Sequence, residues 1–410
     1  MKKALGTIIL TLAALPAMCQ EGPRILYNVL YEYYFDNREF AGHEDYTRSQ
    51  TFHSARLTPM VGVGFNQDGN LHHSVMAGID LLKNMGEASV MADDRKIENW
   101  GLFHEMSLWY NVETKVGRKD LSCFAGMFSR RFSAIGSQDT PDGAFPGRNI
   151  PAVFLNDELR FYDNNIEGIL MKLSDRRSYA ELGLDWKGKY GKNRREQFLI
   201  FSYGKFALTR CLNAGWAAMG HHYANAEMFG GVVDDHTVSP FVELDLAPFT
   251  SGKLQALSLS LNGIYGYHRE RAKGKEYDIT HGAEAALDIR SRGIGIHNSL
   301  YYGTSQYPYY QVTSPEGTIY GQDLYRGNPF YQAKGIAGSW KDKGFYDRFE
   351  AYYQPHVSAF LDLRLAFAFH FAEGGYQGWQ QKFSLVFNLD KVLGRRSSRM
   401  KSPERHETIM

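Results

Sequence analysis

Histidine, serine and cysteine side chains are the residues that could support hydrolysis or hold a metal. His297 and Ser299 are two residues apart in GIGIHNSLYYG, whereas His72–His73 and His221–His222 are adjacent pairs. A pair two residues apart on a strand lies about 7 Å apart along the chain, which is too far for direct proton transfer. Adjacent strand residues point to opposite faces, so neither histidine pair chelates one metal easily. CxxC, HExxH, P-loop and GxSxG motifs are absent. We therefore expect no enzyme activity, no metal site and no cofactor.

The remaining chemistry lies in charged side chains that alternate with apolar ones. In VSAFLDLRLAFAFHF, residues 357–371, the leucines and the phenylalanines 367, 369 and 371 share one face, and Asp362, Arg364 and His370 share the other. A buried helix would leave these polar groups in an apolar interior at a cost of several kcal/mol each. The stretch therefore predicts a strand with one apolar and one polar face.

The same period of two recurs along the chain between turn residues, for example in RLTPMVGVGF, SYAELGLDWKG, TVSPFVELDLAPF, YDITHGAEAALDIR and KFSLVFNLD. It predicts strands near residues 25–36, 51–65, 71–84, 100–113, 120–132, 157–163, 166–173, 178–188, 194–206, 211–223, 237–249, 253–270, 276–291, 293–304, 345–354, 357–371 and 380–390. The segment 157–163 has the weakest pattern, so we expect about sixteen strands.

The length of these segments distinguishes two all-β folds. A soluble sandwich also alternates, but its strands are usually about five or six residues long, whereas many segments here run ten to fifteen. Tyrosine and tryptophan gather at the expected strand ends, which is typical of membrane interfaces. They are Tyr31, Tyr33, Tyr34, Trp100, Trp109, Tyr110, Trp186, Tyr301, Tyr302, Tyr352 and Tyr353. The sequence thus predicts an all-β fold, a transmembrane antiparallel up-and-down β-barrel of about sixteen strands located in the outer membrane.

The composition of the two ends of the sequence divides the chain into three regions. Residues 1–19 combine Lys2 and Lys3 with an apolar run and Ala17-Met18-Cys19, which predicts a signal peptide cleaved before Gln20; lipidation of Cys19 is the alternative. Residues 20–390 are expected to form the barrel. Residues 391–410 are basic and without pattern, which predicts a disordered tail, with binding to lipid headgroups as the alternative.

Charge, apolar run length and cysteine content argue against nucleic-acid-binding, helical membrane and disulfide-rich proteins. The chain has 46 Lys and Arg against 45 Asp and Glu, so nucleic acid is not an expected partner. After residue 19 the sequence contains no apolar run long enough for a transmembrane helix. Cys123 and Cys211 are too few for a disulfide scaffold and are expected to point to opposite faces.

Charged residues on the polar face are the candidate solute contacts, because charges that line a pore select its solutes. They are Arg56, Glu105, Glu181, Asp185, Glu243, Asp245, Glu284, Asp288, Arg290, Asp362, Arg364 and His370. The alternative is that same-face pairs such as Asp288 with Arg290 only neutralise one another. Because both signs are present, we expect weak ion preference.

Three connections, 86–99, 133–156 and 303–344, exceed the usual loop length and are expected on the external side. The third is rich in tyrosine, which can offer aromatic faces and hydroxyls to a solute in the lumen. A surface loop that packs on its own tyrosines is the alternative. The candidate residues are Tyr307, Tyr309, Tyr310, Tyr320, Tyr325 and Tyr331.

The chain resembles porin-like outer-membrane β-barrels of Gram-negative bacteria. The resemblance is carried by ARLTPMVGVGF followed by HHSVMAGIDLLKNMG, and by FAGMFSRR, ELGLDWKG, RREQF, LYRGNPFYQ and QQKFSLVFNLD. It implies a barrel that contacts the lipid bilayer, lipopolysaccharide and the barrel-assembly machinery, with an unknown oligomeric state. We expect a channel for passive diffusion of small hydrophilic solutes. The alternative is a loop-plugged barrel that acts as a surface receptor or anchoring partner for a secreted or lipoprotein component.

Overall fold

A computed structural model describes residues 21–40, 49–67, 70–85, 103–136, 150–175, 177–228, 230–310, 312, 320–332, 339–358 and 360–392. The expected signal peptide, the first long loop at 86–99 and residues 393–410 of the expected tail lie outside the described residues.

Strands make up most of the described chain. They are β1 (Glu21–Phe40), β2 (Gln50–Gln67), β3 (Leu71–Asn84), β4 (Phe103–Val116), β5 (Lys119–Ser129), β6 (Asn165–Ser174), β7 (Ser178–Gly188), β8 (Gln197–Ala207), β9 (Leu212–Tyr223), β10 (Val233–Asp245), β11 (Ala256–Glu270), β12 (Asp278–Ser291), β13 (Ile294–Thr304), β14 (Lys343–Tyr353), β15 (His356–Ser358), β16 (Leu361–Ala372) and β17 (Gly375–Val392). The short helices are η3 (Arg130–Phe132), α2 (Asp157–Tyr162), η5 (Ala247–Phe249), α3 (Gly321–Leu324) and η6 (Pro329–Gln332).

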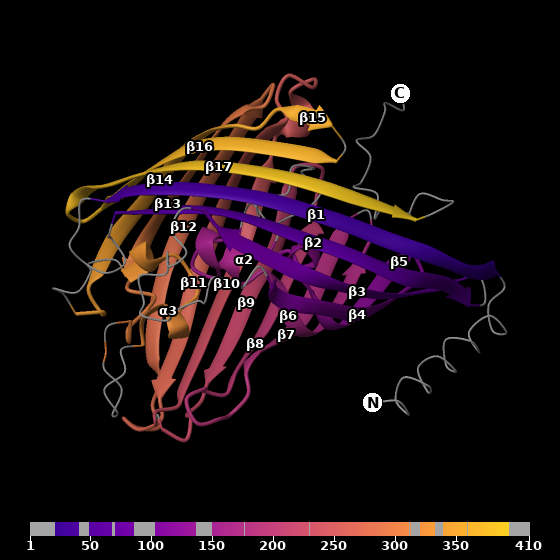
Figure 1. The fold of residues 1–410 in the computed structure, drawn as a ribbon. Coiled ribbons are helices and arrows are strands. Elements are labelled where there is room, and N and C mark those ends of the chain that lie inside the picture. The colour runs from indigo at the N-terminus through magenta and orange to yellow at the C-terminus, as the bar shows by residue number, and fades with distance from the viewer. Residues whose placement is uncertain are drawn as a thin grey trace.

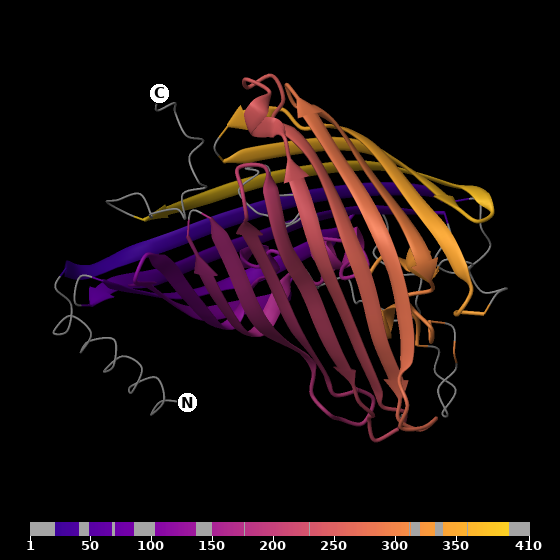
Figure 2. The ribbon, with the colours of Figure 1, turned by 180° about the vertical axis from the view of Figure 1, so that it is seen from behind.

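The strands form a closed ring. β1 pairs antiparallel with β2 and, on its other side, with β17, from Leu26 opposite Val392 to Phe40 opposite Gly378. The strands between them pair with their neighbours in sequence, except that β14 pairs directly with β16 while the three-residue β15 pairs with β16 beside the ring. The result is a closed antiparallel barrel of sixteen strands (Figure 1, Figure 2). This confirms the predicted fold class.

The weakest predicted strand, 157–163, is instead the short helix α2. The side chain of Asn156 caps it, because its Oδ1 accepts a hydrogen bond of 2.7 Å from the backbone N–H of Leu159. Asp157 and Glu158 occupy the first turn, where negative charge is favourable. The other sixteen predicted segments each overlap a strand of the barrel.

The two faces of the wall differ as the alternation predicts. On β11, Leu259 and Leu261 are 43% and 54% exposed, whereas the intervening Ser260 and Asn262 are 3% and 2% exposed. On β16, Phe367 is exposed and His370 is buried. Exposed apolar side chains over a whole ring of strands are unfavourable in water but suit the hydrocarbon of a bilayer. Within the described residues no helix is long and apolar enough to span a membrane.

The sequence predicts that tyrosine and tryptophan at the strand ends face the membrane interfaces, and this is wrong for several of them. Trp186, Tyr302 and Tyr353 are exposed on the outer face, whereas Tyr301 and Tyr352 are buried on the inner face. The inner face also holds Tyr34, 8% exposed, and Trp109, which packs on Phe124 and Phe132. The reason is the pleat, since only one of two adjacent strand residues can reach the lipid side.

The two ends of the barrel differ in their connections. The start of β1, the end of β17 and most of the short turns share one end, as at Arg292 and Gly293, whose φ values of 50° and 84° form a tight hairpin turn between β12 and β13. The two-residue turn between β16 and β17 is an exception and lies at the opposite end. The long connections, including 130–164 and 305–342, share the opposite end. Short turns are periplasmic in barrels of this type, so the long connections lie on the external side.

Candidate functional site

Two of the external connections fold inward and pack together inside the barrel. The first inserted segment comprises residues 130–136 and 150–164, with η3 and α2, and the second comprises residues 305–310, 312 and 320–332, with α3 and η6. Both contribute side chains to one buried apolar cluster with inward-facing strand residues, including Val153, Tyr307, Phe201 and Phe241. The lumen is therefore narrowed by protein rather than left as an open tube.

The tyrosines of the second inserted segment are buried. Each of the six predicted loop aromatics is at most 7% exposed. The hydroxyl of Tyr307 donates to the backbone carbonyl of Val153 in the first inserted segment at 3.0 Å. Wall strands hold other members, since Tyr309 donates to Asp278 at 2.6 Å, Tyr320 donates to Glu270 at 3.0 Å and Tyr331 donates to Glu284. These tyrosines thus fasten the segment to the wall, which differs from the alternative of a surface loop that packs on its own tyrosines.

Asp163 joins the two inserted segments to the wall. Its carboxylate pairs with Lys187 of β7 at 2.5 Å, with Arg130 of η3 at 3.4 Å and with Arg326 of the second inserted segment. Burial alone would raise the pKa of Asp163, but Arg130, Arg326 and Lys187 outweigh it and lower the pKa well below the usual range. Asp163 is therefore a charged connection between three parts of the chain at neutral pH.

A second group of charges lies where α2 meets β14, β16 and β17, and we call it the charge cluster: Asp157, Arg160, Arg348, Glu350, Arg364 and Lys382. Lys382 lies 2.8 Å from Glu350 and 3.0 Å from Asp157. Arg348 lies 2.6 Å from Glu350 and 3.3 Å from Asp157. Four cationic side chains thus share two carboxylates, which leaves the charge cluster with excess positive charge.

Asp157 is the carboxylate that α2 contributes to the charge cluster. Burial alone would raise its pKa, but the charges of Lys382, Arg348 and Arg160 outweigh burial and lower the pKa far below the usual range. Asp157 therefore remains ionised throughout the physiological range. It attaches the first inserted segment to β14 and β17.

The charge cluster borders a polar cavity together with acidic residues of β12. Glu284, Asp288, His297 and Ser299 line the same cavity, whose volume open to the centres of water-sized spheres is about 50 Å³. Tyr352 donates to Asp288 at 3.0 Å, and the Nδ1 of His297 lies 4.0 Å from that carboxylate. The cavity is therefore lined by carboxyl groups of β12 and by the cations and carboxylates of the charge cluster.

The predicted lumen-lining residues occupy inward-facing strand positions, but they do not form one site. Glu284, Asp288 and Arg364 meet at the cavity. Glu181 accepts from the backbone N–H of Ala134 at 2.8 Å and Asp185 accepts from Arg130 at 2.7 Å, so both hold the first inserted segment.

Others of the predicted residues have separate partners in the lumen. Glu243 pairs with Lys205 at 2.6 Å, and Arg56 lies 3.4 Å from Asp80. His370 is 1% exposed and stacks on Phe330 of η6, 5.0 Å between ring centres. It lies under the second inserted segment.

Sequence reasoning missed five members of the charge cluster. The alternation of β14 could have found Arg348 and Glu350, which share the inner face of KGFYDRFEAYY, and Lys382 falls on the polar face of the predicted last strand. Asp157 and Arg160 left no such signal, because their segment has no clear strand period and reaches the cavity only through the inward fold of its connection.

Comparison with solved structures shows the same architecture. A loop-deletion mutant of OmpT, an outer membrane protein of Vibrio cholerae, aligns with 7% identity and a TM-score of 0.51 over 90% of this chain and 100% of its own. OpdL of Pseudomonas aeruginosa aligns with 11% identity and a TM-score of 0.47 over 89% of this chain and 99% of its own. The outer membrane protein OprD of Pseudomonas aeruginosa aligns with 13% identity and a TM-score of 0.40, covering 91% and 94%. No protein-family model and no curated protein matches the sequence.

The closed sixteen-strand ring, the apolar outer face and the fold shared with OmpT define the class of this protein: it has the fold of a porin-like outer-membrane β-barrel. This agrees with the fold and the location that the sequence predicts.

Proposed function

We propose that the chain forms a channel for passive diffusion of small hydrophilic solutes across the outer membrane. The observation that carries the proposal is the polar cavity, where the carboxyl groups of Glu284 and Asp288 and the cationic groups of the charge cluster border the same space. Charges of opposite sign on different sides of a narrow pore create a transverse field, which orients polar solutes and disfavours apolar ones.

In this proposal, fewer of the predicted lumen-lining residues contact solute than the sequence suggests. Glu284, Asp288 and Arg364 remain solute contacts, and Arg348 and Lys382 join them. Other inward charges, such as Glu181 and Asp185, position the first inserted segment, which sets the width of the passage. The barrel would contact the bilayer through its apolar face, with lipopolysaccharide and the barrel-assembly machinery as further partners.

A loop-plugged receptor is the second candidate function, and one observation favours it. The six tyrosines of the second inserted segment are buried, and a cavity of about 50 Å³ holds only a few water molecules. A barrel closed in this way could present its external face to a secreted or lipoprotein component. For solutes to pass, the inserted segments must open a wider path.

Planar-bilayer recording of the purified protein separates the two functions. A channel gives stepwise conductance, whereas a permanently plugged barrel is electrically silent. For a channel, replacing Lys382→Gln removes one positive charge beside the cavity and should shift the reversal potential in a salt gradient toward cation permeation.

Lys205→Gln is the matched control, because Lys205 also faces the lumen and pairs with a carboxylate, Glu243, away from the cavity. It should shift the reversal potential less than Lys382→Gln. Equal shifts would contradict the cavity as the selective passage, and silence of the wild-type protein would favour the receptor.

A further inference from the structure

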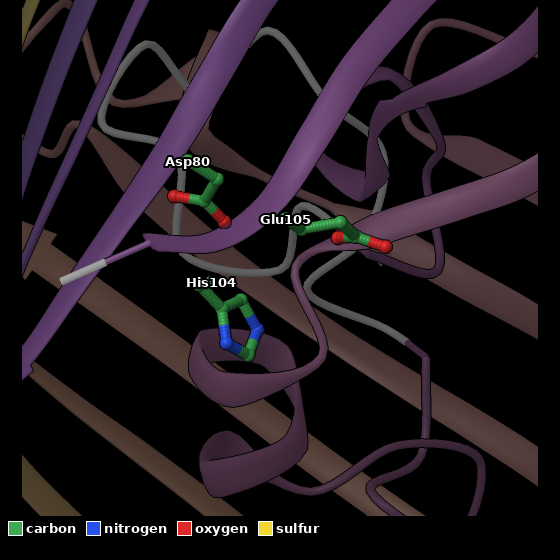
Figure 3. A group of neighbouring side chains, drawn as sticks. All are labelled: Asp80, His104 and Glu105. Atoms are coloured by element: carbon green, nitrogen blue, oxygen red, sulfur yellow. The ribbon is translucent and has the colours of Figure 1, made fainter. Parts of the chain in front are cut away.

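Three potential metal ligands come together at the inner wall, apart from the charge cluster. Asp80 lies near the external end of β3, and His104 and Glu105 lie near the external start of β4. One donor atom of each side chain lies within 4.8 Å of one donor atom of both others (Figure 3). An imidazole and two carboxylates are the donor types that divalent transition metals use in proteins.

An irregularity in the strand pairing explains how adjacent residues can serve one site. Asp80 pairs with Glu105 and Leu81 pairs with Phe103, so His104 is an extra residue between two pairs. A bulge of this kind breaks the strict alternation of a strand and redirects a side chain. His104 can therefore approach Asp80 and Glu105 (Figure 3).

The hydrogen bonding of Asp80 is a second, independent observation that favours a cation site. Asp80 is fully buried, and its Oδ1 accepts from Thr58 at 3.0 Å and lies 3.4 Å from the Nε of Arg56. Both of these partners are on β2, on one side of β3. Its Oδ2 is buried without a hydrogen-bond partner among the described residues. A buried carboxylate oxygen without a partner is costly, and a bound cation on the β4 side would satisfy it.

We propose that Asp80, His104 and Glu105 bind a divalent transition-metal cation such as Zn²⁺. Bonds of about 2.1 Å place tetrahedral donors about 3.4 Å apart, so the three side chains need to close by less than about 1.5 Å. The side chain of His104 is exposed and free to make that adjustment.

Neighbouring residues supply an outer layer for the site. The amide of Asn165 donates to Glu105 and orients its carboxylate, and Arg56 and Thr58 hold the other oxygen of Asp80. Such partners raise metal affinity because they fix the ligands before binding. A bound cation would join β3 to β4 at the base of an external connection, through three protein ligands with remaining positions open to water.

Zinc titration of the purified full-length barrel tests the proposal. After treatment with a chelator and its removal, calorimetry with Zn²⁺ should show one tight site per chain in detergent. His104→Ala should weaken that site by about tenfold or more, and Asp80→Asn should do the same. Co²⁺ should give a visible absorption band with the wild-type protein that His104→Ala abolishes.

His72→Ala is the matched control, because His72 is an exposed histidine on the same strand as Asp80 and hydrogen-bonds to Asn66 at 2.7 Å. It should leave the tight site unchanged. Heat-modifiable migration in gels verifies that each variant is folded, and His104→Ala keeps the test valid if Asp80→Asn misfolds. Unchanged affinity in His104→Ala, or equal loss in His72→Ala, would overturn the proposal.

Discussion

Asp163 should control how firmly the two inserted segments stay in the lumen. It is the common partner of Arg130, Lys187 and Arg326, which belong to the first segment, the wall and the second segment. Asp163→Asn keeps the shape but removes the charge, which leaves three cations near one another without that carboxylate.

The size of the effect follows from the burial of these groups. Breaking a buried ion pair costs about 3 to 5 kcal/mol and an exposed pair about 0 to 1 kcal/mol. The side chain of Asp163 is 21% exposed and its partners are 4% to 12% exposed, so an intermediate cost applies. About 2 kcal/mol corresponds to a roughly 30-fold increase in the population in which the segments are detached.

Hydrogen–deuterium exchange measures this population directly, because backbone amides exchange when a segment opens locally. In Asp163→Asn, amides of residues 320–332 should exchange about 30-fold faster, and a channel should show more frequent opening in bilayer recordings. Asp175→Asn is the control, since Asp175 has similar exposure, 25%, but pairs with Lys119 at a turn between β6 and β7. If the amides of residues 320–332 exchanged at rates within about twofold of each other in the two variants, the inference that Asp163 holds the inserted segments in place would be refuted.

Three more predictions concern the two faces of the wall and its ion pairs. Phe367→Arg places a charge on the lipid face and should impair assembly by about 2 to 4 kcal/mol near the bilayer midplane, measured by heat-modifiable migration, whereas Arg364→Ala should assemble normally and change ion selectivity; equal assembly defects would contradict the two faces. Tyr331→Phe removes the hydroxyl that donates to Glu284 and should destabilise the barrel by about 1 to 3 kcal/mol in denaturant titration, and no change would show that this hydrogen bond is dispensable. Because the pKa of Asp157 is lowered in the folded protein, its contribution to stability is present above its ordinary pKa and is lost only as the pH falls below that value. The protection factors of amides around α2, which are the intrinsic exchange rates divided by the observed rates at the same pH, should therefore be constant from pH 5 to 8 and fall in stronger acid; a difference in protection between pH 6 and 7 would contradict this.

The barrel itself was predictable because alternation is a local property. The alternation within each strand shows which of its side chains face lipid. The two faces of β11 and β16 could therefore be assigned without knowing the neighbouring strands. The girdle prediction was wrong for Tyr301 because it used only position at a strand end, whereas the alternation of the same strand already places Tyr301 and Tyr302 on opposite faces.

The sequence by itself determined the class of fold, the strands and the polar character of the inner face, because a period of two over many long segments is compatible with few structures other than a membrane barrel. Only the tertiary structure decided which polar residues meet. Asp157 reaches Lys382, and Asp163 reaches Arg326, because external connections fold back into the lumen. The approach of His104 to Asp80 depends on one extra residue in the pairing of β3 with β4. These contacts join residues far apart in the chain, and no local period encodes them.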